Sequence, residues 1–170
     1  ILQREAVIKK MVENGELFPV RVGGVKQEFY VLRELLHLLD DLDTPIDEKI
    51  YFIAPLDNLL WDRKVISEIF DFDYSWEVYK VPEKRIHGYY VMPVLCGTRL
   101  IGRLDPKLDR QNEKMVINSL SIIDKDLNRS FINELVTSLR RFLQFHNVAH
   151  VSVQRTQPEE LRDVLARELS

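Results

Sequence analysis

The apolar residues at the start of the chain fall close to helical spacing: Ala6, Val7, Ile8, Met11 and Val12. This pattern predicts a helix that ends at Asn14-Gly15, because glycine accepts the left-handed conformation of a helix C-terminus. Val20 and Val22 then alternate with charge, Gly23-Gly24 can form a tight turn, and residues 29–32 predict a return strand. A helix followed by such a hairpin is the second half of a winged-helix motif, but any α+β domain can contain the pair, and these residues alone favour that ordinary interpretation.

The patterns that follow alternate between helix and strand. Residues 33–43 predict a short helix, Pro45 interrupts a connector, and residues 50–56 predict a buried strand. Residues 54–70 carry an amphipathic helical pattern that Asp57 would cap, with Leu59, Leu60, Val65, Ile66, Ile69 and Phe70 on its apolar side.

The second half of the chain has mainly strand patterns. Four short strands are predicted at 76–80, 87–95, 99–105 and 115–121, with a hairpin turn at Cys96–Thr98. They suggest an antiparallel meander, curled into a small barrel. The pattern ends with a helix over 130–146, a strand over 148–153 and a last helix. This last helix begins with a capping box at Thr156 and Glu159 and has Pro158 in its first turn. We therefore predict an α+β fold with two domains, the C-terminal part of a winged helix plus a connecting helix at 1–45 and a barrel-like domain at 46–170.

Composition narrows the class of protein. The 170 residues are 45% hydrophobic and 30% charged, which is typical of a globular protein, and the net charge of −3 shows no overall bias toward nucleic acid. The single cysteine, Cys96, cannot form an internal disulfide, so a reducing compartment is expected. No apolar run reaches the roughly 18 residues of a membrane helix. The chain begins inside a helical pattern without an initiator Met, so we expect a fragment of a longer protein. Some of Val7, Ile8, Met11 and Val12 should then be unusually exposed.

Motifs for metals, cofactors and nucleophilic catalysis are not found. His37, His87, His146 and His150 lack metal-ligand spacing, and Cys96 has no evident base partner. Neither a phosphate-binding glycine loop nor a nucleophile-elbow motif occurs. We therefore expect no metal and no small-molecule cofactor.

The most informative feature is a basic stretch over residues 80–114. It holds eight bases and four acids, a local excess of four positive charges in an acidic chain, with Tyr89 and Tyr90 among them. Such a stretch suits phosphate contacts. The alternating charges Arg103, Asp105, Lys107 and Asp109 are spaced by two, so a strand would place them on one face. Such a face suits a solvated ladder of ion pairs as well as it suits DNA. Without other information, the solvated face is the favoured interpretation.

Two long segments resemble a known family. "PLDNLLWDRK" and "EVYKVPEKRIHGYYVMPVLCGTRLIGRLDPKLDR" are similar to the winged-helix DNA glycosylases of the YcaQ/AlkZ type, which in bacteria release crosslinked or bulky alkylated bases. The similarity runs from about Leu17 to the final helix and corresponds to the C-terminal portion of such a protein. The resemblance implies tandem winged helices that hold double-stranded DNA, with a β-hairpin approaching the minor groove.

The resemblance also implies a Gln-x-Gln or Gln-x-Asp/Glu catalytic motif with an apolar middle residue, which would lie upstream of Ile1. Three segments match this motif only at its first and third positions: Gln3-Arg4-Glu5, Gln111-Asn112-Glu113 and Gln157-Pro158-Glu159. No catalytic residue is therefore assigned. We expect Trp61 to anchor its helix in the core between winged helix and barrel, and Asp62 and Arg63 to form a hydrogen-bonded pair that locks this junction.

The favoured hypothesis is a non-catalytic, DNA-binding fragment of a repair glycosylase, monomeric in its full-length form and acting in the cytoplasm at the nucleoid. One alternative is a transcription-regulator-like binding module without enzymatic activity, and another is an interaction domain whose basic stretch is only a solvated face. The residues expected to contact DNA are Arg4, Lys9, Lys10, Arg21, Lys84, Arg85, His87, Tyr89, Arg99, Arg103, Lys107 and Arg110.

Overall fold

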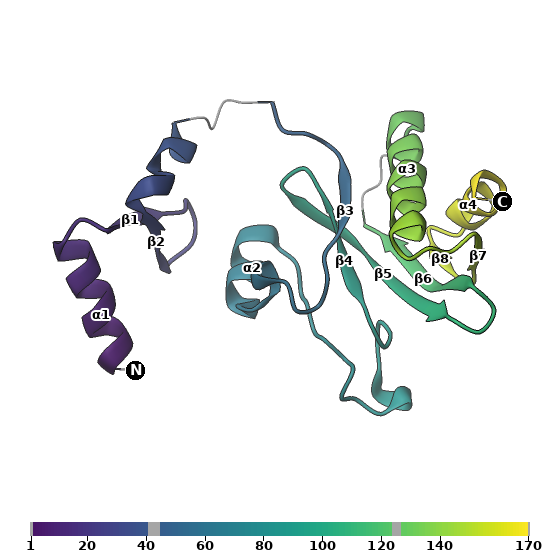
Figure 1. Cartoon of the computed structure of the whole chain (residues 1–170), viewed down its shortest axis with the longest axis horizontal. Coiled ribbons are helices and arrows are strands. Elements are labelled where there is room, and N and C mark those ends of the chain that lie inside the picture. The colour runs from purple at the N-terminus through teal and green to yellow at the C-terminus, as the bar shows by residue number, and fades with distance from the viewer. Residues whose placement is uncertain (1, 41–44, 124–126, 170) are drawn as a thin grey trace. The chain divides into compact units, whose positions relative to one another are not determined.

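The computed structural model describes residues 2–40, 45–123 and 127–169 (Figure 1). The chain forms two compact units, residues 1–46 and residues 47–170. Each unit is an α+β structure by itself, which confirms the predicted fold class.

The first unit contains the predicted helix and hairpin. Helix α1 (Leu2–Glu13) is followed by strands β1 (Leu17–Arg21) and β2 (Glu28–Leu32), which pair antiparallel. Gly15 has a φ of 69°, the left-handed conformation expected where the helix ends. The helix predicted over 33–43 is a 3₁₀ helix, η1 (Arg33–Leu39), and residues 41–43 lie outside the described residues.

The first unit has no residue that is fully buried among those described. Val7 is 56% exposed, and Ile8, Met11 and Val12 are half-buried. The exposure of Val7 agrees with the expectation that some of these four apolar side chains are left uncovered. Burial of apolar surface is the main stabilising term for a domain, so this unit has little core of its own.

The second unit is built on a curled, mixed sheet that forms a half-barrel. Its strands are β3 (Ile50–Phe52), β4 (Met92–Cys96), β5 (Arg99–Asp109), β6 (Lys114–Ile122), β7 (His150–Val153) and β8 (Thr156–Gln157). The order is β3-β4-β5-β6-β7, and β8 pairs with β6. The predicted antiparallel meander is correct for its last three strands, which are β4, β5 and β6, and its first strand, at 76–80, is not formed. Strand β3 extends the antiparallel pairing, whereas β7 and β8 run parallel to β6. The reason is helix α3 (Arg129–Phe145), which carries the chain back over the sheet as a crossover.

The two faces of this sheet are covered differently. Helices α3 and α4 (Glu160–Glu168) pack on one face (Figure 1) and bury the main core with Leu104, Leu120 and Leu139. Helix α2 (Arg63–Phe70) contributes to a smaller core with Leu60, Phe72 and Leu100 on the other face. Leu100 belongs to the beginning of β5, so the small core covers this second face beside the β4-β5 hairpin.

Register shifts decide which side chains the second face presents. One shift lies between Val94 and Leu95 of β4 and another between Asp105 and Pro106 of β5. Arg103 pairs with Ser121 and Asp105 with Ser119, so these four polar side chains lie on the second face beyond the small core.

The segment around Trp61 differs from the prediction. The helical pattern of residues 54–70 is divided into a 3₁₀ helix, η2 (Asn58–Leu60), which Asp57 caps, and α2, which Asp62 caps. The Asp62 carboxylate accepts hydrogen bonds from the backbone N–H groups of Lys64 (3.0 Å) and Val65 (3.2 Å), so the predicted Asp62–Arg63 pair is wrong. Trp61 lies between the two caps and is 74% exposed, so it is not part of the core of the second unit, and its predicted place at the junction with the first unit stays a prediction.

Two further predictions are wrong for local reasons. Residues 76–80 form a turn instead of a strand, because Glu77 points inward to bind backbone groups of the following loop. Thr156 belongs to β8 and its hydroxyl donates to the carbonyl oxygen of Glu159, so it does not form a capping box with α4.

Replacing Asp62 tests its role as a helix cap. We expect Asp62→Ala to lower the free energy of unfolding by about 1 kcal/mol, because two N–H groups at the start of α2 lose their acceptor. Arg63→Ala is the matched control and should change stability much less. Equal losses in the two variants, measured by urea denaturation followed by circular dichroism, would instead support an Asp62–Arg63 pair.

Candidate nucleic-acid interface

The loop that precedes β4 is organised around one buried carboxylate. This basic loop, residues 77–90, includes the short 3₁₀ helix η3 (Pro82–Lys84). Glu77 Oε2 accepts hydrogen bonds from the backbone N–H groups of Ile86 (2.9 Å), His87 (2.8 Å) and Gly88 (3.3 Å), while Oε1 binds Lys80 Nζ at 2.8 Å. The Glu77 side chain is completely buried. It therefore joins the two ends of a loop that has no strand pairing of its own.

The hydrogen bonds keep Glu77 ionised despite its burial. Burial raises the pKa of a carboxyl group, but here the bond from Lys80 and the bonds from the backbone of His87 and Gly88 outweigh it and lower the pKa of Glu77 to about 2. The buried negative charge is thus balanced by the lysine and by aligned backbone dipoles.

A second buried acid ties the loop to the sheet. Asp105 of β5 accepts hydrogen bonds from the backbone N–H of Tyr90 (3.1 Å) and from the side-chain amide of Asn118 (3.2 Å). Gly88 passes so close that a Cβ atom there would lie 2.3 Å from Asp105 Oδ2, and its φ of 143° also favours glycine. Asp105 is only 6% exposed, so the interpretation of a solvated ladder fails at this position.

The anchored loop presents both basic and apolar side chains to solvent. Lys84 is exposed, and Arg85 lies over the ring of Tyr89 (4.8 Å to the centroid) while its Nε donates to the carbonyl oxygen of Lys80 (2.9 Å). Tyr79 is 88% and Ile86 78% exposed. A loop held from within and exposing cations and apolar tips has the chemistry of a surface that contacts phosphates and a groove.

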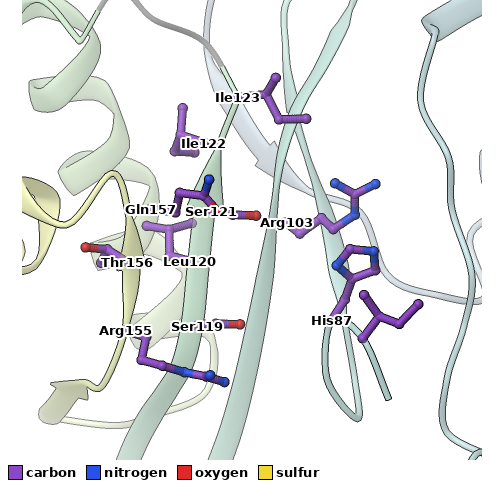
Figure 2. A pocket seen from close by; sticks show the side chains of 11 residues that line it. His87, Arg103, Ser119, Leu120, Ser121, Ile122, Ile123, Arg155, Thr156 and Gln157 are labelled. Atoms are coloured by element: carbon purple, nitrogen blue, oxygen red, sulfur yellow. The ribbon is translucent and has the colours of Figure 1, made fainter. Parts of the chain in front are cut away.

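A polar cavity of about 490 Å³ lies between the basic loop and the second face of the sheet. Figure 2 shows Arg103 and His87 close together, Ser119 and Ser121 on β6, Gln157 on β8, and Arg155 directly before β8. Two arginines line this polar cavity, and none of the described residues that line it is acidic. Guanidinium groups bind phosphate and carboxylate oxygens through several N–H donors, so the polar cavity suits an anion.

Arg103 is held in place rather than free in solution. One of its terminal nitrogens donates to the carbonyl oxygen of Asp73 (2.5 Å), and its guanidinium lies 4.1 Å from the centroid of the Phe72 ring. Burial lowers the pKa of Arg103, but an arginine in a protein remains protonated. Burial, together with the charge of Arg103, also lowers the pKa of His87, so its imidazole is neutral at neutral pH.

The predicted DNA-contacting residues fall into several groups. Lys84, Arg85, His87 and Arg103 come together at the basic loop and the polar cavity. Tyr89, Lys107 and Arg110 line a separate aromatic groove, which is formed by Phe52, Tyr89, Tyr90, Phe142, Phe145 and His146. Arg99 lies elsewhere, in a pocket with Asp47, Lys49 and Glu134. The remaining four residues, Arg4, Lys9, Lys10 and Arg21, belong to the first unit and are exposed.

Several residues of the interface were not predicted. Glu77 and Asp105 act as anchors, and Ser119, Ser121, Arg155 and Gln157 complete the polar cavity. An acid inside an otherwise apolar segment, as in "WEVYK", was the available signal for Glu77. Arg155 and Gln157 depend on the pairing of β8 with β6, which no local pattern shows.

Other site types find little support in the described residues. No three His, Cys, Asp or Glu side chains among residues 2–40, 45–123 and 127–169 gather where they could hold a metal ion. Within the same ranges, no helix has the length and apolar character needed to cross a bilayer.

Comparison with known proteins identifies a family. A family model described as DNA glycosylase AlkZ-like matches residues 2–145, which is most of the chain and includes the basic loop, the sheet up to β6 and α3. No solved structure matches the chain.

Removing the Glu77 carboxylate should release the basic loop. We expect Glu77→Ala to lower the free energy of unfolding at pH 7 by about 3 kcal/mol, because Lys80 and three N–H groups lose a buried acceptor. Glu83→Ala, at an exposed acid of the same loop, is the matched control and should change stability by less than about 0.5 kcal/mol.

The pKa of Glu77 predicts how stability depends on pH. Its folded-state pKa of about 2 lies below the ordinary value of 4.5, so its contribution is complete above pH 4.5 and is lost as the pH falls toward 2. The stability difference between wild type and Glu77→Gln should therefore shrink over that range in urea titrations. A difference that stays constant down to pH 2 would contradict this account.

Proposed function

This chain belongs to the AlkZ-like DNA glycosylase family, and from that premise we propose that it supplies a DNA-holding surface of such a repair protein. The observation that carries the proposal is the polar cavity, which Arg103 and Arg155 line with no acid among its described residues, beside a basic loop fixed by Glu77. The reaction of the whole protein would be hydrolysis of the N-glycosidic bond to a crosslinked or alkylated base. It would take place in the cytoplasm, on the nucleoid.

Phosphate contact is the interaction that this surface favours. Lys84 and Arg85 on the loop and the two cavity arginines offer cationic donors at several points. The loop is already ordered by Glu77 and Asp105, so little conformational freedom would be lost on binding. Contacts of this kind position a duplex without reading its sequence.

The first unit supports the same function as part of a winged helix. Helix α1 is followed at once by the β1-β2 hairpin, which corresponds to the wing. Arg4, Lys9 and Lys10 lie on α1 and Arg21 at the end of β1, all exposed. Lys9 has a long ion pair with Glu13 (3.9 Å), which is weak enough to exchange for a phosphate.

We assign no catalytic residue to this chain. The glutamines that match the outer letters of the family motif lie in unrelated places: Gln3 in α1, Gln111 in the turn between β5 and β6, and Gln157 in β8 at the polar cavity. None of the three has the apolar middle residue that the resemblance implies.

The catalytic part of the proposal is tested with damaged DNA. The purified 170-residue chain should release no base from alkylated or crosslinked duplex, measured by strand cleavage at the resulting abasic sites. Gln157→Ala is the informative variant, because Gln157 lines the polar cavity. Base release by the wild-type chain that disappears in Gln157→Ala would refute the assignment.

The binding part is tested by reversing charge on the basic loop. We expect the double variant Lys84→Glu, Arg85→Glu to weaken binding to every duplex sequence and to flatten the slope of log K against log salt by about 2 units. The double variant Arg162→Glu, Arg167→Glu on the exposed side of α4 changes the net charge equally and is the matched control.

Stability must be measured in the same variants. Arg85 stacks on Tyr89 and binds the carbonyl oxygen of Lys80, so its replacement costs more than that of a free surface charge. The single variant Lys84→Glu avoids this effect and should still flatten the slope by about 1 unit. Unchanged slopes in the loop variants would mean that the loop is only a solvated face. Strong dependence on DNA sequence would support the regulator-like alternative.

A further inference from the structure

The aromatic groove is a second cavity of the same unit, with a volume of about 640 Å³. It opens where the C-terminal end of α3 meets β3, the last residues of the basic loop and the middle of β5. Phosphate contacts on the basic loop and the polar cavity do not account for it. Its lining differs sharply from that of the polar cavity, because rings predominate over hydrogen-bonding groups.

The rings of the groove are arranged edge to face. The Phe142 ring contacts those of Phe52 (centroids 5.4 Å apart, 71° between planes) and His146 (4.6 Å, 72°). Phe145 in turn contacts His146 (5.1 Å, 84°). Phe142 thereby connects the groove to the core, whereas Phe145 is 80% exposed. An exposed phenylalanine at the end of such a ring series adds little to folding and offers a flat apolar face.

Among the described residues that line the groove, those with a permanent charge are cationic. Lys107 and Arg110 are exposed on its rim, and none of the described lining residues is Asp or Glu. Arg85 lies over the Tyr89 ring and adds a further cation beside it. Burial, together with the charge of Arg110, lowers the pKa of His146, so this ring is neutral at neutral pH and can stack or form a hydrogen bond.

We infer that the aromatic groove holds an unstacked nucleobase of a DNA strand, with the base on the Phe145 ring and the adjacent phosphates at Lys107 and Arg110. This inference rests on the proposed function and extends it to a second contact. Flat aromatic faces beside cations, with no acid among the described lining residues, match a nucleotide, whose base is planar and whose phosphate is anionic. An apolar peptide or an aliphatic chain would not use the two cations.

The test compares three duplexes with the same flanking sequence. One is fully paired, one contains a single unpaired adenosine, and one contains an abasic nucleotide at the same position, which keeps the phosphate and the bulge but removes the base. The full 170-residue chain is titrated with each by fluorescence anisotropy. The adenosine bulge should bind about tenfold tighter than the abasic bulge, within the range expected for base–aromatic stacking.

Variants then locate the base. Phe145→Ala should remove the tenfold difference and leave binding to the paired duplex unchanged. Trp61→Ala is the matched control, because Trp61 is also a highly exposed aromatic residue of this unit but lines neither cavity, and it should keep the difference. A thermal melt confirms that both variants are folded. Phe145→Leu keeps apolar volume without the ring and should also lose the difference.

The outcomes separate this inference from the proposed function. If the chain binds the paired duplex and binds the adenosine and abasic bulges with equal affinity, the inference about the aromatic groove is wrong and the proposed function stands. If it binds only the adenosine bulge tightly, the inference is supported and phosphate contact by the basic loop is contradicted. If it binds none of the three duplexes, both proposals are contradicted. A change in molar mass on Phe145→Ala, measured by sedimentation equilibrium, would show that the groove joins two copies of the chain and would also overturn the inference.

Discussion

The carboxylate of Glu77 is the group on which the arrangement of the interface depends. The basic loop brings Lys80, Lys84 and Arg85 close together and has no strand partner for its backbone at residues 86–88. Repulsion and unpaired N–H groups would both favour an open loop. One buried carboxylate opposes both effects, since it pairs with Lys80 and accepts three backbone hydrogen bonds. These contacts are the reason why the pKa of Glu77 is low.

The sheet provides the second constraint, through uneven coverage of its faces. Helices α3 and α4 bury one face, while α2 with Phe72 and Leu100 forms only a small core on the other. Before the register shift between Asp105 and Pro106, Asp105 pairs with Ser119 and Arg103 with Ser121 on this second face. Polar side chains can therefore line a cavity on one face of the sheet, while the apolar side chains of the same strands point to the other face and pack against α3 and α4.

Local signals in the sequence were sufficient for elements formed by neighbouring residues. The helix before Gly15, the hairpin after it and the amphipathic α3 all follow from spacing and turn chemistry. Trp61 and Asp62 show the limit, because one apolar pattern was interpreted as a single helix although Asp62 starts a new one. Residue type could not show that Asp62 binds backbone rather than Arg63.

The candidate site was predictable only in its charge. The excess of basic residues at 80–114 located Lys84, Arg85, Arg103 and Lys107, but it did not distinguish Arg103, which is tethered, from Lys107, which is exposed. Partners far apart along the chain decide such differences: Glu77 binds residues 9 to 11 positions later, and Asp105 binds Tyr90. Arg155 and Gln157 line the polar cavity because β8 pairs parallel with β6 after the crossover through α3. Such a pairing between distant strands produces no periodic pattern in the sequence.

The basic loop also connects the two cavities physically. Ile86 and His87 line the polar cavity, and Tyr89 and Tyr90 line the aromatic groove, with only Gly88 between them. Glu77 binds the backbone on one side of this boundary and Asp105 on the other. Since both acids are buried and hydrogen-bonded, the spacing between the two cavities is fixed, and so would be the spacing between an anion in one and a base in the other under the two proposals. A strand that occupies both cavities would thus be read for its local geometry, namely whether a base can leave the stack next to a held phosphate, and this is a property in which damaged and intact duplexes differ.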